Sequence, residues 1–293
     1  MLLLGAPLVP GVSARTKSVL TGRRGAPVWQ LYADLWKLTR RGVVYSDTTT
    51  WIFRLAPVAT LATTLAAAAL LPLDGRAALL GFAGDAVAFA ALLALGRFVL
   101  VLAALDTGSS FEGMGASRDA TFATLLEPGV LVAFAVLGIA AREFSLNAML
   151  GGAGRIAAPL ALPSLVMVAV SLFALALAEC ARVPVDDPAT HLELTMVHEV
   201  MVLDHSGPDL ALILYASALK LALFAAIIVN VLVPAPRPGG AVGAAVLLGS
   251  LVAMGVAIGF VESVMARLRL PRVPLYIAGA SALALFGLIL VLR

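Results

Sequence analysis

Seven apolar stretches, each close to 20 residues long, constrain this chain more than any other feature of its sequence. They cover about residues 52–73, 83–105, 121–141, 160–179, 210–234, 241–262 and 273–292. A helix rises ~1.5 Å per residue, so about 20 apolar residues cross a hydrocarbon core ~30 Å thick. The alternation of membrane barrel strands is absent, so the backbone must satisfy its polar groups within helices. The sequence predicts an all-α polytopic bundle of about seven spanning helices, with residues 1–293 forming one integral membrane domain.

The composition agrees with a membrane protein. Hydrophobic residues make up 61% of the chain and charged residues only 13%, against roughly a quarter in soluble domains. The first thirteen residues, MLLLGAPLVPGVS, are apolar but too short to span, and they fit a signal peptide poorly. They predict a short or truncated amino-terminal apolar segment. The lone Cys180 excludes a disulfide framework within the chain, and the net charge of +3 gives no indication of a nucleic-acid partner.

The basic residues predict the orientation. Most Lys and Arg residues fall in segments 14–51, 106–120, 180–209 and 263–272, which the positive-inside rule places in the cytoplasm. The two longest of these segments, 14–51 and 180–209, therefore face the same compartment. The first is basic and the second is acidic, so together they predict a docking face for a soluble partner. The alternative is that both are solvated loops near lipid headgroups.

Five ionisable residues lie in the apolar stretches or at their ends: Arg97, Glu127, Glu179, Lys220 and Glu262. Such residues cost about 3 kcal/mol each on insertion scales and are usually functional. Glu127 precedes Pro128, which interrupts helical hydrogen bonding. Lys220 has no opposite charge within one turn, so its partner must come from another helix or loop. We expect Glu127 and Lys220 to belong to a buried polar network that relays protons. For Arg97, Glu179 and Glu262 the alternative is that they reach the headgroups.

The sequence contains no catalytic pattern. It has no nucleotide-binding glycine loop, no nucleophile with a matching base, and no third ligand for the pair His191 and His198. We therefore predict no catalytic residue and no metal site in this chain. A stand-alone transporter remains a remote alternative, although matching halves with interrupted helices are not apparent.

Four segments together resemble the membrane-anchor subunit, subunit 1, of respiratory complex I and of complex-I-like membrane [NiFe] hydrogenases. They are GRRGAPVWQLYADLWKL (22–38), LDTGSSFEGMGASRDATFATLLEP (105–128), AECARVPVDDPATHLELTMVHEVMVLDHSG (178–207) and FVESVMARLRLPR (260–272). The formate hydrogenlyase and hydrogenase-4-type branch is the most similar. In the third segment Ala189 and His191 stand where complex I has carboxylates, and in the next helix Ser217 stands where complex I has a Glu.

The resemblance implies roles for particular residues. The proton pathway is expected to include Glu127, Glu179, Asp186, Glu193 and Lys220. The docking and coupling loops are expected to use Arg23, Arg24, Gly25, Asp34, Lys37, Arg118, Arg182 and Asp187. The partners implied are a hydrogenase-like large subunit and an iron–sulfur subunit on the cytoplasmic side, with antiporter-like subunits in the membrane.

The resemblance also implies that this chain carries no cofactor and that [NiFe] and iron–sulfur clusters belong to those partners. The expected location is the cell inner (plasma) membrane. A quinone-reducing relative, with quinone as a further partner, remains an alternative, as does a complex whose large subunit has lost its nickel site.

Overall fold

The computed structural model describes residues 1–73, 77–151, 161–186, 196–233 and 240–292, and the regular secondary structure within them is entirely helical. Six helices are long and apolar enough to cross a membrane, and α8 adds a shorter apolar one. In chain order the helices are α1 (Leu2–Gly5), α2 (Leu8–Leu20), α3 (Gln30–Thr39), α4 (Trp51–Ala69), α5 (Asp85–Asp106), α6 (Ser110–Ala141), α7 (Leu146–Leu150), α8 (Ala161–Glu179), η2 (Glu199–Val202), α9 (Gly207–Leu232), α10 (Gly240–Val264), η3 (Leu270–Arg272) and α11 (Val273–Val291). The predicted polytopic helical bundle is confirmed.

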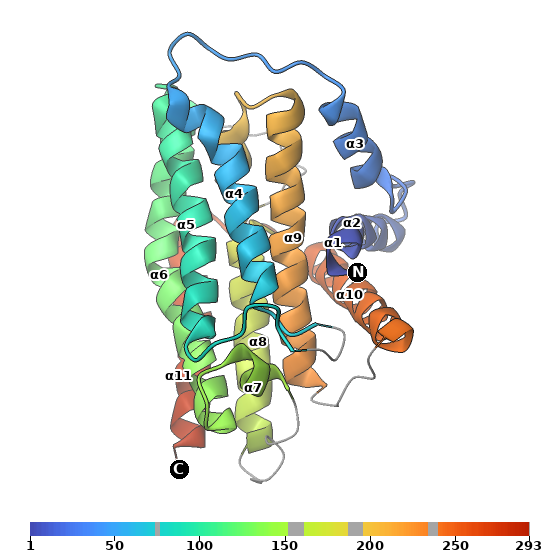
Figure 1. Ribbon diagram of the computed structural model, residues 1–293, viewed down its shortest axis with the longest axis vertical. Helices are drawn as coiled ribbons and strands as arrows, with labels where there is room; N and C mark the ends of the chain where they lie inside the picture. The colour runs from blue at the N-terminus through green and yellow to red at the C-terminus, as the bar shows by residue number, and fades with distance from the viewer. Residues whose placement is uncertain (74–76, 152–160, 187–195, 234–239, 293) are drawn as a thin grey trace.

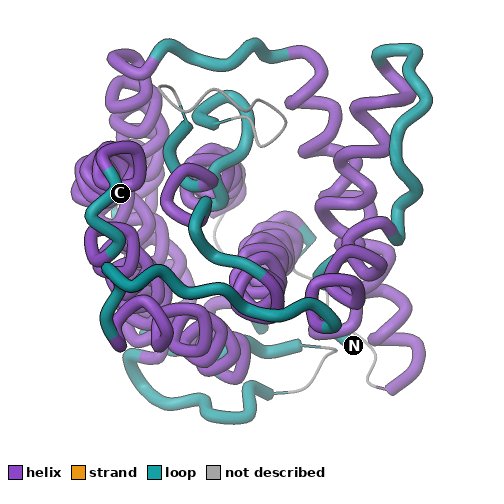
Figure 2. The backbone as a smooth tube through the Cα atoms, turned by 90° about the horizontal axis from the view of Figure 1, so that it is seen from above, coloured by secondary structure: helices purple, strands orange, loops and turns teal. Residues whose placement is uncertain are grey.

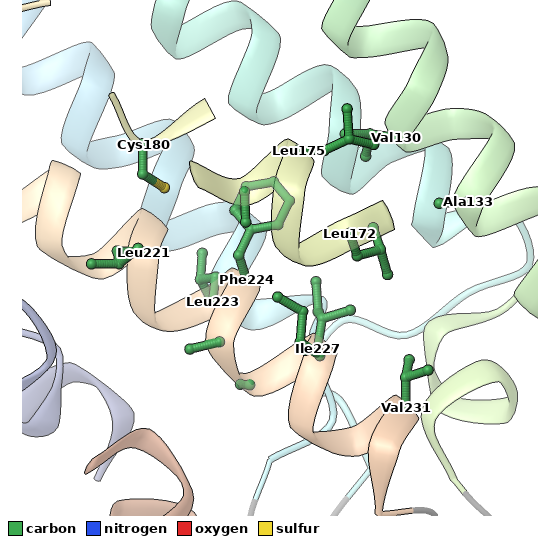
Figure 3. Close-up of a cluster of buried hydrophobic side chains, with 14 of the residues drawn as sticks. Val130, Ala133, Leu172, Leu175, Cys180, Leu221, Leu223, Phe224, Ile227 and Val231 are labelled. Carbon is green, nitrogen blue, oxygen red and sulfur yellow. The ribbon is translucent and has the colours of Figure 1, made fainter. Parts of the chain in front are cut away.

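The long helices stand side by side, and several appear nearly end-on when viewed from above (Figures 1 and 2). Helices α4, α5, α6, α8, α9 and α11 pack together, while α10 and the amino-terminal helices lie on one flank. In the centre, Phe224 and Ile227 of α9 lie among Leu172 and Leu175 of α8 (Figure 3). Because lipid tails are as apolar as these side chains, close packing rather than escape from water holds such helices together.

Two predicted loops contain helices. Segment 14–51 includes the end of α2 and all of α3, and α6 begins at Ser110, so most of 106–120 is its first three turns. Polar sequences such as FEGMGASRDATF lack an apolar run, and the prediction therefore missed a helix that extends beyond the lipid. At 32 residues, α6 is longer than the roughly 20 residues that a span requires.

The amino-terminal apolar segment packs on α10. A Cβ added at Gly259 of α10 would lie 2.7 Å from the Thr16 Cβ of α2, and one added at Gly255 would lie 3.1 Å from the Val9 carbonyl oxygen. The absence of side chains at these glycines permits the close approach. The tyrosine hydroxyls of Tyr32 and Tyr215 donate to carbonyl oxygens of the neighbouring α1.

The four predicted cytoplasmic segments meet at one end of the bundle. Thr50 donates to Asp106, through its backbone N–H at 2.7 Å and its hydroxyl at 2.8 Å. The Val44 N–H donates to the Ser206 hydroxyl at 3.1 Å. The Leu268 N–H donates to the Pro184 carbonyl at 2.8 Å. These contacts join segments that are distant in sequence into one surface.

Candidate functional site: a buried charge network

Arg97 lies at the centre of a cluster of charges inside the bundle. Its side chain is only 9% exposed. One terminal guanidinium nitrogen pairs with the Glu179 carboxylate, the other lies 3.7 Å from the nearest Glu127 carboxylate oxygen, and Nε lies 3.7 Å from Asp119 Oδ2. The alternative in which Arg97 reaches the headgroups is therefore wrong, because three carboxylates surround its guanidinium inside the protein.

Lys220 completes the network from α9. Its Nζ lies 3.4 Å from Glu179 Oε1, which confirms that its partner comes from another helix. Glu179 is thus held between two cations, and its side chain is 5% exposed. The interfacial alternative is wrong for Glu179, and also for Glu262, which is buried and pairs with Arg182 at 3.5 Å. Helices α5, α6, α8 and α9 each contribute a charge that has its partners on other helices.

The network reaches the side of the bundle at Glu127. Its side chain is 45% exposed, far more than those of Arg97 and Glu179. The cavity beside Glu127 is lined by Ala90, Ala94, Val130 and the same Arg97 and Glu179. A carboxylate exposed within a spanning helix is costly in lipid, so this opening is a place for protein or water rather than acyl chains.

A second set of ion pairs holds the chain that leaves α8. Asp186 Oδ1 lies 2.8 Å from an Arg267 guanidinium nitrogen, and Asp186 Oδ2 accepts from the backbone N–H groups of Val197 at 3.0 Å and His198 at 3.3 Å. Arg118 donates to the Met196 carbonyl at 3.0 Å. The described ends of segment 180–209 are therefore fixed to both α6 and the α10–α11 connection.

His198 joins the two sets. It lines one cavity with Arg97, Asp119 and Lys220, and another with Asp186. Burial, assisted by the positive charge of Lys220, lowers the pKa of His198 to about 4. The imidazole is therefore neutral near pH 7, and it offers one donor and one acceptor nitrogen between the loop charges and the central network.

A larger cavity, about 160 Å³ in volume, opens next to this histidine. It lies between α2, α3, α9 and the residues after α8, with Pro10, Leu31 and Ile213 among its apolar lining residues. Its charged and titratable lining residues include Arg182, Asp186, His198 and Glu199. Its position brings together the two long segments that the sequence predicted as the docking face.

The predicted site residues separate into groups. Glu127, Glu179 and Lys220 belong to the central network, while Asp186, Arg182 and Arg118 belong to the loop contacts. Glu193 and Asp187 lie outside the described residues. The others occur in or before α3: Arg23, Arg24, Gly25, Asp34 and Lys37. Among these, Gly25 accepts from Arg15 at 3.2 Å and Asp34 from Gln30 at 2.9 Å.

Sequence reasoning missed Asp119 and Arg267. The sequence predicts a loop at Asp119, whereas Asp119 lies on the same continuous helix as Glu127. Hydropathy gives no signal for a helix in the polar residues that precede the apolar stretch. Arg267 was assigned to topology alone, and only the fold brings it to Asp186. In the described part of the chain, no three His, Cys, Asp or Glu side chains are placed to hold one metal ion.

Comparison with known proteins gives consistent matches. The family model described as NADH dehydrogenase matches residues 1–292. Hydrogenase-4 component C of Escherichia coli (strain K12) is 31% identical over 81% of this chain and 74% of that protein. Formate hydrogenlyase subunit 4 of the same organism is 30% identical over 92% and 88%. A chain of an archaeal respiratory membrane complex, the membrane-bound sulfane sulfur reductase, has the same fold, with a TM-score of 0.84, 17% identity and coverage of 99% and 95%.

Proposed function

This chain belongs to the NADH dehydrogenase family as a multi-pass membrane subunit of a complex-I-like complex, and we propose that it anchors the complex and couples it to proton movement. The complex is of the formate hydrogenlyase or hydrogenase-4 type and lies in the cell inner membrane. On the cytoplasmic side, segments 14–51 and 180–209 dock a hydrogenase-like large subunit and an iron–sulfur subunit, which carry the [NiFe] and iron–sulfur clusters. Antiporter-like subunits lie beside it in the membrane.

The observation that carries the proposal is a series of polar groups that runs from the loop toward the side of the bundle. It starts at Asp186, which accepts from the His198 backbone N–H. The neutral His198 then lines a cavity with Lys220, Lys220 pairs with Glu179, and Arg97 links Glu179 to Glu127. Buried ions paired across several helices respond to any change in their neighbours, because a low-dielectric interior screens them weakly.

The mechanism follows from that response. A redox event in the docked module moves the chain after α8, so that Asp186 and Arg182 change their distances to Arg267 and Glu262. The altered field changes the proton affinity of Glu179 and then of Glu127. Coupling requires that the proton affinity of Glu179 and Glu127 differs between the two positions of the loop. If their proton affinity were equal in both positions, the loop movement would change no protonation state. Glu127, at the opening, exchanges its proton with the neighbouring membrane subunit.

The test is Glu127→Gln in the intact complex. Proton translocation into inverted vesicles is expected to fall, while assembly and electron transfer from artificial donors are retained. The matched control is Glu143→Gln, which removes an exposed carboxylate just beyond the other end of α6 and should leave translocation unchanged. Undiminished translocation in Glu127→Gln would remove this residue from the pathway.

The cavity of about 160 Å³ favours a second candidate, a quinone-site subunit. It is mostly apolar with a few polar groups on one side, which is the usual character of a small-molecule site. Matched assays of quinone reduction and hydrogen evolution by the purified complex separate the two functions. The second candidate would be supported if the unmodified complex reduces quinone without evolving hydrogen, and if Leu31→Trp, which fills the cavity, abolishes that quinone reduction.

A further inference from the structure

The outer face of α3 carries a combination of side chains that neither docking nor proton transfer explains. The three tryptophans of the chain are Trp29, Trp36 and Trp51, and their exposed fractions are 66%, 63% and 71%. Trp29 and Trp36 are two helical turns apart, with exposed Lys37 and Arg40 beside them. The opposite face of α3 is partly covered, and its Leu31 lines the larger cavity.

The depth of α3 places this face beside the lipid. Leu31 shares the cavity with Ile213 and Ala218 of α9, which begins at Gly207. At a rise of ~1.5 Å per residue, these neighbours lie about 9–16 Å from the start of α9. Figure 1 shows α3 alongside the upper part of α9, within the height of the spanning helices. This level lies within the height of the spanning helices and near the end where the segments predicted as cytoplasmic meet, as expected for an interfacial helix.

The side chains suit that layer. Indole rings are enriched at membrane interfaces because they combine an apolar body with one polar N–H. The Arg40 guanidinium lies 4.3 Å from the centroid of the Trp36 ring, an arrangement that holds the cation over an aromatic face. Lys37 adds a second cation on the same side of the helix. Arginine and lysine recognise phosphate groups, and arginine does so with two parallel hydrogen bonds.

We propose that the outer face of α3, defined by Trp29, Trp36, Lys37 and Arg40, binds anionic phospholipid of the inner leaflet. The indoles contact the glycerol and upper acyl region, and the two cations contact the phosphate and the anionic headgroup. This assigns Lys37 to lipid rather than to the docked soluble subunits. The amino-terminal helices are thereby held against α10 by the bilayer as well as by their packing.

The tryptophans themselves are the probe. The complex, or the full chain, is placed in nanodiscs of phosphatidylcholine or phosphatidylglycerol brominated near the glycerol end of the acyl chains. In a Trp51→Phe variant, fluorescence reports on Trp29 and Trp36 within this chain. We expect brominated lipid to quench that emission. We also expect the quenching to be stronger for brominated phosphatidylglycerol than for brominated phosphatidylcholine, because the site prefers the anionic lipid. Tryptophan emission from partner subunits is subtracted by measuring the variant in which all three tryptophans of this chain are replaced by phenylalanine.

Charge variants test the headgroup preference. Lys37→Gln and Arg40→Gln are each expected to reduce the preference for phosphatidylglycerol by up to about fivefold, with quenching by brominated lipid retained. Arg142→Gln is the matched control, because it removes an exposed cation at the carboxyl end of α6, away from α3. It should leave the lipid preference unchanged. Three results would overturn the proposal. The tryptophans could be quenched by aqueous iodide instead of brominated lipid, they could be shielded from both quenchers by a partner protein, or the lipid preference could be unaffected by the charge variants.

Discussion

Replacing Arg97 with Met is expected to be among the most destabilising single changes in the network. It leaves Asp119, Glu127 and Glu179 with Lys220 as the remaining cation described among them. Removing one partner of a buried ion pair costs about 3–5 kcal/mol, because the other charge stays buried without compensation. Lys220→Met should cost less, about 1–3 kcal/mol, since Glu179 keeps its contact with Arg97.

The assay is thermal unfolding of the purified complex or chain in one detergent, followed by tryptophan fluorescence. With roughly 2–4 °C per kcal/mol for a chain of this size class, Arg97→Met lowers Tm by about 6–20 °C. Adding Asp119→Asn to Arg97→Met should recover part of that loss, because it removes an uncompensated carboxylate. In the unmodified protein the same Asp119→Asn change should not raise Tm, since Asp119 Oδ2 faces Arg97 at 3.7 Å.

The order of the two effects is the sharp result. A Lys220→Met variant less stable than Arg97→Met, or a double variant no more stable than Arg97→Met alone, would show that Arg97 is not the charge that compensates the carboxylates. A matched control is Arg54→Met: Arg54 is exposed at the start of α4, and its guanidinium lies 4.7 Å from the Tyr45 ring centroid. Its loss should change Tm much less than the loss of Arg97.

Two further predictions concern the loop contacts. Burial lowers the pKa of His198 to about 4, so between about pH 6.5 and pH 4 the unfolded chain binds a proton that the folded chain does not, and the stability falls as the pH decreases through that range. His198→Gln should therefore reduce the decrease in Tm between about pH 7 and pH 5. An unchanged pH dependence of Tm would contradict this. Gly115→Ala should destabilise the protein, because the added Cβ would lie 2.9 Å from the Val197 carbonyl oxygen. The control Gly113→Ala places its Cβ where nothing lies within 4 Å, and it should stabilise α6 by up to about 1 kcal/mol. Equal shifts in Tm for the two variants would refute the packing argument.

The predictions that succeeded rest on local physical constraints. Apart from the start of α6, the apolar stretches predicted the ends of the spanning helices to within a few residues, because the thickness of the bilayer sets the length of any helix that crosses it. Lys220 without a local partner correctly indicated a long-range contact. The boundaries failed where polar residues form helix beyond the lipid, as in the first turns of α6, since hydropathy carries no signal there.

Sequence alone determined that this protein is a helical membrane bundle with ionisable residues inside it, because both conclusions follow from counting apolar residues against the cost of burying charge. Tertiary structure decided which charges meet. Asp119 and Arg97 are on different helices, and Asp186 reaches Arg267 from a distant connection. The rotation and depth of each helix set those distances. Those quantities depend on packing between helices, which no single segment specifies.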